Sequence, residues 1–120
     1  MSFDAAHALF GPLARAETEV AAFAFLAGDG RLLGMRHLRG NCISAVDVPV
    51  RQIVADALAF DAAGVVMAHN HPSGDPSPSA ADRTITRRLL AALDAVNIRL
   101  VDHLVLAEDR AVSFLALGWL

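Results

Sequence analysis

The chain has 120 residues, 55% of them apolar, and a formal net charge of -3 at pH 7. This length and composition predict one compact domain over residues 1–120 with its own hydrophobic core. The acidic balance and the lack of a basic run argue against a domain whose main task is to bind nucleic-acid phosphates, because such domains usually carry a basic patch.

Cysteine usage and hydropathy indicate a cytoplasmic location. Cys42 is the only cysteine, so an intrachain disulfide is impossible and a reducing compartment is the natural interpretation. The first residues lack the basic segment and apolar core of a secretory signal peptide. No apolar run approaches the roughly 20 residues that span a bilayer, and we therefore expect no membrane segment.

Hydrophobic periodicity predicts helices and strands in alternation along the chain. The expected elements, in chain order, are a helix over 2–16 (within an N-terminal helical segment, 1–16), strands over 19–27 and 31–38, a helix over 48–61, a strand over 63–68, a helix over 79–96, and strands over 98–106 and 111–114. Gly11-Pro12 interrupts the first helix pattern, and Gly40-Asn41-Cys42 is expected to lead into a further short strand. This order predicts an α/β chain with a mixed, curved sheet flanked by helices.

The helix over 48–61 is predicted from an apolar stripe at positions i, i+3, i+4, i+7 and i+8. Asp47 stands before it as a candidate cap, and Pro49 suits its first turn. Its polar residues, Asp56 among them, are expected to be solvated. The members of the stripe are Val50, Ile53, Val54, Ala57 and Leu58.

Several other residues have a structural interpretation. Cys42 is expected to be a small buried residue, although a reactive thiol or an extra ligand is the alternative. Asp102 and His103 are expected to support the structure or a site from behind, without binding metal themselves. The apolar tail over 115–120, with Trp119, is expected to pack on the domain or against a second copy, so a homodimer is possible.

The stretch His69-Asn70-His71 follows the buried strand predicted over 63–68. Side chains alternate along an extended backbone, so His69 and His71 point to the same side and Asn70 to the other. Two imidazoles on one face of a strand end can hold one metal ion. A lone His-x-His pair is more often structural, and the neighbouring residues therefore decide the interpretation.

A loop rich in proline, over 72–78, returns the chain to a helix start at Ser79. Ser79 and Asp82 match a capping box, in which the serine caps the helix and the acid three residues later reaches back. The same loop could bring Asp82 beside the two histidines. Two imidazoles and one carboxylate would then be three protein ligands, leaving the fourth tetrahedral position for water, as in catalytic zinc sites.

The whole constellation resembles a known family. His69-x-His71, seven residues, Ser79, two residues and Asp82 are similar to the signature of JAMM (MPN+) metalloprotease domains. The run HNHPSGDPSPSAAD over 69–82 resembles the RadC branch of that superfamily, as do Asp102-His103-Leu-Val-Leu and Ser113-Phe114 with Gly118. The resemblance covers roughly residues 17–118. It implies the JAMM fold, which has a cytidine-deaminase-like sheet.

The resemblance also implies the roles of individual residues. His69, His71 and Asp82 would hold one Zn²⁺ per chain, and Ser79 would donate a hydrogen bond to an oxyanion. The family carries a glutamate at the head of the first strand, eight residues before the turn, and counting back from Ala27 gives Glu19. That glutamate acts as general base in the family.

The sequence leaves the assignment of the general base open between Glu19 and Glu17. Glu17 takes the role of the base if the register differs by two. Without the resemblance, Glu19 would be interpreted as an exposed charge at the start of a strand.

Together with the resemblance, these residues imply a zinc-dependent hydrolase that, like members of the family, cleaves a peptide or isopeptide bond in an unknown peptide or protein substrate. One alternative is a RadC-type protein of DNA repair or recombination, which the net charge and the lack of a helix-hairpin-helix region make less favoured. Another is a metal-stabilised interaction domain without turnover, against which the intact ligand motif argues. A nucleobase deaminase is disfavoured because the sequence has no Pro-Cys-x-x-Cys ligand pair.

Overall fold

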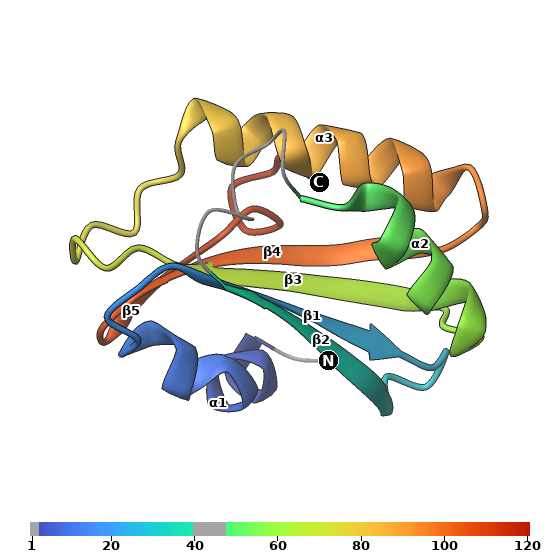
Figure 1. Ribbon diagram of the computed structural model, residues 1–120, viewed down its shortest axis with the longest axis horizontal. Helices are drawn as coiled ribbons and strands as arrows, with labels where there is room; N and C mark the ends of the chain where they lie inside the picture. Colours follow the sequence, from blue (N-terminus) through green and yellow to red (C-terminus); the bar gives the residue numbers. More distant parts are fainter. Residues whose placement is uncertain (1–2, 40–47) are drawn as a thin grey trace.

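The computed structural model describes residues 3–39 and 48–120 (Figure 1). The elements are α1 (Phe3–Ala14), β1 (Val20–Leu26), β2 (Leu32–Arg39), α2 (Val50–Ala59), β3 (Gly64–Asn70), α3 (Ala80–Asp94), β4 (Arg99–Ala107) and β5 (Arg110–Ser113). The predicted order of helix, hairpin, helix, strand, helix and two strands is confirmed. The short strand expected after Gly40-Asn41-Cys42 and the cap expected at Asp47 lie outside the described residues.

The strands form one open mixed sheet in the order β2-β1-β3-β4-β5. Only β3 and β4 pair in parallel among the described strands, and α3 makes the crossover between them. The other neighbouring strands pair antiparallel. Helices α2 and α3 lie on one face of the sheet and α1 on the other (Figure 1). The predicted fold class, an α/β chain with a mixed sheet flanked by helices, is confirmed and is consistent with a JAB/MPN fold.

Alternate residues of β1 and β3 fill two hydrophobic cores, one on each face of the sheet. Phe23 and Phe25 face α2 and α3, as the shared face in the sequence predicts, and they are fully buried. Residues of the opposite parity, such as Ala22 and Val66, pack against α1. Because both faces are covered, β1 and β3 are buried along their whole length.

A β-bulge in β4 changes which side chains face α3. Val65 pairs with Leu100, but the next residue of β3, Val66, pairs with Asp102. The extra residue, Val101, shifts the alternation by one position. His103 consequently pairs with Met67 and points to the α3 face, on which His69 also lies, whereas regular alternation from Leu100 would place it on the opposite face.

The helices differ from the sequence-based expectations in three details. Helix α1 continues through the expected interruption to Ala14, because Pro12 lies in the last turn and disturbs little of the hydrogen-bond ladder. Pro49 occupies the N-cap position, just before the first turn in which it was expected. Leu58 was predicted to belong to the buried stripe but is 55% exposed, since the short α2 turns only Ile53 and Ala57 fully into the core.

Asp56 is not simply solvated. Its carboxylate forms an ion pair with Arg36 of β2 and accepts a hydrogen bond from Gln52. The Arg36 guanidinium holds the pKa of Asp56 below its ordinary value despite partial burial. This pair ties α2 to the sheet.

The C-terminal segment packs on the domain in part, since Trp119 contacts it while Leu115 and Leu117 stay 44% and 46% exposed. The Trp119 ring meets Phe114 edge to face at a centroid distance of 5.1 Å. The Arg83 guanidinium lies 4.2 Å from the Trp119 ring centroid, a cation–π arrangement. Among the helices that the structure describes, none is long and apolar enough to cross a membrane.

Candidate metal centre

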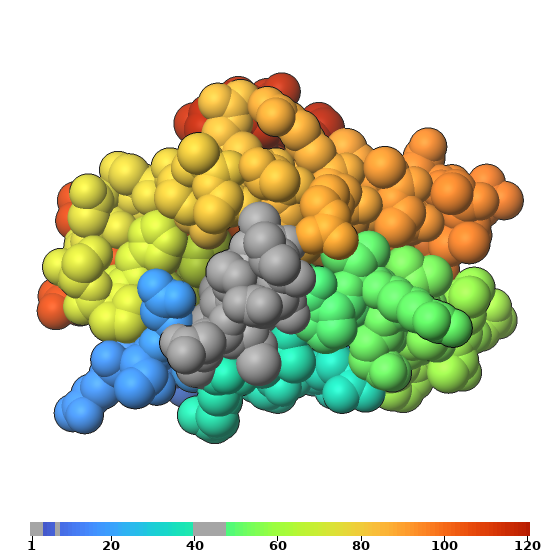
Figure 2. Space-filling view, turned by 45° about the horizontal axis from the view of Figure 1, so that its top comes forward, coloured from blue at the N-terminus to red at the C-terminus, as the bar shows by residue number. Residues whose placement is uncertain are grey.

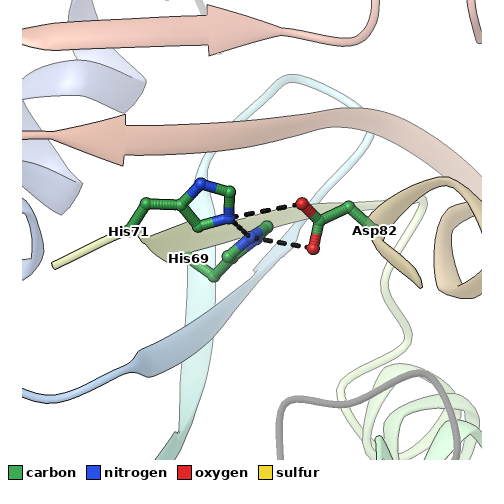
Figure 3. Close-up of side chains that lie close together, drawn as sticks. All are labelled: His69, His71 and Asp82. Atoms are coloured by element: carbon green, nitrogen blue, oxygen red, sulfur yellow. Dashed lines mark hydrogen bonds and ion pairs between the residues drawn. The ribbon is translucent and has the colours of Figure 1, made fainter. Parts of the chain in front are cut away.

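Three side chains from two elements converge at the carboxyl end of β3 (Figure 3). His69 lies at the end of the buried strand β3, and His71 follows just beyond the strand on the same side, with ring centroids 4.9 Å apart. Asp82 comes from the first turn of α3 and is 7% exposed. As expected, the proline-rich loop therefore brings Asp82 back beside the two histidines.

The spacing of the ligand atoms suits a small tetrahedral cation. The Nε2 atoms of His69 and His71 lie 3.0 Å apart. The Asp82 oxygens lie 3.1 Å from Nε2 of His69 and 3.3 Å from Nε2 of His71. Zinc bonds to such ligands are about 2.0–2.1 Å long, which gives a tetrahedron with edges of roughly 3.3 Å. The separation of the two imidazole nitrogens is close to that edge, and the two Asp82 distances, which run to Oδ1 and Oδ2 respectively, show that the carboxylate faces both nitrogens.

Ser79 and Asp82 form the capping box that the sequence also allowed. The Ser79 Oγ accepts a hydrogen bond from the Asp82 N–H at 3.0 Å, and Asp82 Oδ2 accepts one from the Ser79 N–H at 2.7 Å. The cap and the converging site therefore use the same carboxylate. Burial acts to raise the pKa of Asp82, but its contacts with His69 and Ser79 outweigh burial and hold this pKa well below its ordinary value.

A tight turn orients the ring of His71. The Gly74 N–H bonds to the His71 carbonyl at 3.1 Å, and Gly74 has a φ of 88°, which glycine adopts without strain. The Asp75 carbonyl then lies 2.9 Å from the His71 Nδ1. A carbonyl only accepts, so Nδ1 of His71 carries a proton, and Nε2 is the ring nitrogen that faces Asp82.

Glu19 and Ser79 line the same cavity as the converging ligands. This cavity has a volume of about 360 Å³ and is bounded by Glu19, His69, His71, Pro72, Ser73, Ser79, Ala81 and Asp82. Figure 2 shows the chain just before β1 (blue) beside the loop that follows β3 (yellow) on one face of the molecule. Glu17 instead lines an adjoining cavity of about 860 Å³, which shares only His71 and Pro72 with the first.

Asn70 fixes the segment that carries Glu19. Its side chain, fully buried, points away from the two histidines, as alternation predicts. The Asn70 Oδ1 accepts a hydrogen bond from the Val20 N–H at 2.7 Å, and Nδ2 donates to the carbonyls of Ala16 and Thr18 at 3.1 and 3.0 Å. Sequence reasoning missed this role, because the partners lie about 50 residues away.

We expect Asn70→Ala to loosen the segment before β1. The substitution leaves the Val20 N–H and two carbonyls without their partner, and each unsatisfied buried group costs about 1–3 kcal/mol. The free energy of unfolding in urea should fall, and amide hydrogen exchange should accelerate over 16–20 more than in β3. Unchanged exchange over 16–20 would contradict the clamp.

His103 and Asp102, expected to act from behind a site, lie in different surroundings. His103 is fully buried, and its Nε2 lies 2.7 Å from Nδ1 of His69. Asp102 accepts hydrogen bonds from the Ser113 hydroxyl and the Leu115 N–H, at 2.6 and 3.0 Å, and so holds the C-terminal turn. Thr86, which sequence reasoning did not select, contacts the far side of His103.

Comparison with known proteins identifies the family that this fold and site define. The RadC-like JAB domain family matches residues 2–119, and the chain belongs to this family. The resemblance seen in the sequence is thereby confirmed.

The curated relatives carry names that state no activity. A UPF0758 protein of Xanthomonas axonopodis pv. citri is 46% identical over 102 residues, which cover 85% of this chain and 45% of the relative. A UPF0758 protein of Vibrio cholerae is 46% identical over 108 residues, covering 90% of this chain and 68% of the relative. The chain thus spans less than half the length of the Xanthomonas relatives it matches.

Proposed function

We propose that this domain is a zinc-dependent hydrolase that cleaves a peptide or isopeptide bond. The observation that carries the proposal is the convergence of His69, His71 and Asp82 in one cavity with Glu19 and Ser79. When bound there, zinc would polarise a substrate carbonyl and bring the pKa of water toward about 7.

The proposed roles of the protein groups follow from their places in the cavity. Glu19 is exposed to the cavity and accepts the proton of the attacking water, then passes it to the leaving amine. The Ser79 Oγ accepts from the Asp82 N–H through one lone pair, and Ser79 lines the cavity. It can therefore donate to the oxyanion, a contribution of roughly 3 kcal/mol.

The shape of the site supports a polymeric substrate. The cavity of about 360 Å³ and the larger one of about 860 Å³ both have His71 and Pro72 in their walls. An extended peptide could occupy both sides of the reacting bond, whereas a small molecule would need only one cavity. The peptide or protein substrate is thus the partner that we propose.

Metal content tests the foundation of this proposal. Protein purified without chelator should contain about one equivalent of zinc per chain, and Asp82→Ala should lose most of it because one of three ligands is gone. Elemental analysis measures both. Full zinc occupancy in a His69→Ala, His71→Ala double variant would contradict the assignment of these residues as metal ligands. Ser77→Ala, in the same loop but outside the cavity lining, is the control that should keep its metal.

A further inference from the structure

A chain of buried hydrogen bonds runs behind His69, away from the cavity. His103 of β4 lies with Nε2 at 2.7 Å from the His69 Nδ1. The other ring nitrogen of His103, Nδ1, lies 2.5 Å from the hydroxyl oxygen of Thr86. That oxygen lies 2.8 Å from the backbone carbonyl of Asp82, one helical turn earlier in α3. The chain therefore begins and ends at two of the converging ligand residues.

The last contact gives the chain a direction. The Asp82 carbonyl can only accept, so the Thr86 O–H must donate to it. The single hydroxyl proton is then used, and the Thr86 oxygen accepts from Nδ1–H of His103. If the Thr86 O–H donated to His103 Nδ1 instead, the Thr86 oxygen and the Asp82 carbonyl oxygen would lie 2.8 Å apart with no proton between them.

The contact between His103 and His69 determines which ring nitrogen of His69 carries a proton. His103 is fully buried, and among the described residues its ring nitrogens meet the Thr86 hydroxyl and the His69 ring but no carboxylate, so the ring is neutral and carries only the Nδ1 proton. Its Nε2 is then an acceptor, which His69 satisfies by donating from Nδ1–H. His69 consequently presents its Nε2 lone pair to the point that His71 Nε2 and the Asp82 carboxylate also face.

We infer that Thr86 and His103 are positioning residues that fix His69 in the tautomer whose Nε2 is free to bind a metal ion. The inference rests on the proposed metal site. Because the acceptor behind His69 is a neutral imidazole and not a carboxylate, it orients the ligand without adding negative charge. Phe114 stacks on His103 at a centroid distance of 4.4 Å and keeps its ring in place.

The chain offers a well-matched pair of threonines for the test. Thr84 makes the same hydroxyl bond to the carbonyl four residues earlier, at 3.0 Å from Ala80, but is exposed and contacts no histidine. Thr86→Val removes the acceptor of the His103 Nδ1–H with little change of shape. Thr84→Val removes an equivalent helix contact, and Thr86→Ser keeps the acceptor.

Heteronuclear NMR of the histidine ring nitrogens reads the tautomers directly and needs no activity. In the wild type, His103 should carry its proton on Nδ1, with and without zinc. In metal-free Thr86→Val, the proton should move to Nε2 and point at His69, while Thr84→Val and Thr86→Ser should resemble the wild type. A wild-type His103 protonated on Nε2 overturns the inference, even if a variant fails to fold.

Zinc affinity, measured by competition with a chromophoric chelator, is the second readout. Loss of such a supporting contact weakens metal binding roughly 10- to 100-fold, and we expect this for Thr86→Val but not for Thr84→Val. Equal affinity in all variants together with a shifted His103 proton would also overturn the inference. A wild type that binds no zinc would contradict the proposed function instead, and the NMR result would still test the tautomer of His103.

Discussion

Glu19→Gln should abolish turnover while the protein keeps its fold and its zinc. The amide has nearly the shape of the carboxylate but cannot accept a proton, so the step in which water loses its proton is blocked. General base catalysis contributes roughly 10²- to 10⁴-fold, and kcat should fall by that order. Zinc content should stay at the wild-type level, because Glu19 lines the cavity without belonging to the converging ligand group.

Glu17→Gln is the matched control. Glu17 lies two residues earlier on the same segment but lines the adjoining cavity, away from His69 and Asp82. Its kcat should remain near that of the wild type on a library of internally quenched peptides and lysine-linked isopeptides. If Glu17→Gln lost activity and Glu19→Gln kept it, the base would be reassigned. No turnover by the wild type on either bond type would favour a metal-stabilised interaction domain.

Local sequence signals predicted the element order and allowed the three converging residues to meet, and the family resemblance selected that interpretation over a structural one. The strand that ends in His69, the alternation that places His71 on the same side, and the capping-box spacing from Ser79 to Asp82 are all contained within 20 residues or fewer. Alternation and capping depend on neighbouring residues alone, so a single sequence reveals them. The proline-rich loop is short, which left α3 little freedom to lie elsewhere.

The supporting contacts could not be predicted in the same way. Asn70 holds carbonyls more than 50 residues earlier in the chain, and Thr86 meets His103 across 17 residues and two elements. The bulge at Val101 places His103 on the face toward α3, and the residue pattern of β4 does not indicate an extra residue. Such contacts depend on the sheet register, which forms only when distant segments pair. For the same reason, the ion pair of Asp56 was not foreseen.

The Ser79 hydroxyl has two roles, one as the N-cap of α3 and one as the proposed donor to the oxyanion. As N-cap of α3, its oxygen accepts from the Asp82 N–H, and the capping box shows that this role is filled. As proposed oxyanion stabiliser, its O–H donates into the cavity that it lines with Glu19. One hydroxyl has a donor and two lone pairs, so both can be satisfied together. Variants that separate accepting from donating will therefore separate stability from turnover.

Three substitutions of Ser79 make this separation. Ser79→Ala neither accepts nor donates, and should lose about 1 kcal/mol of stability through the missing cap. It should also lose roughly a hundredfold or more in kcat. Ser79→Asp caps as well as serine but cannot donate when ionised, and it places a negative charge near the developing oxyanion. We expect near-normal thermal stability, retained zinc and very low activity.

Ser79→Asn completes the series, because its amide oxygen can cap the helix while its amide N–H groups can still donate. It should match Ser79→Asp in melting temperature and zinc content but exceed it in kcat, since only the donor differs in kind. Thermal melts, elemental analysis and peptide turnover on the same preparations give the three quantities. If Ser79→Asp instead lost stability while its activity persisted, accepting and donating would not be the two roles of this hydroxyl. Equal activity of Ser79→Asp and Ser79→Asn would show that the donor contributes nothing, and the cap alone would explain why α3 begins with serine.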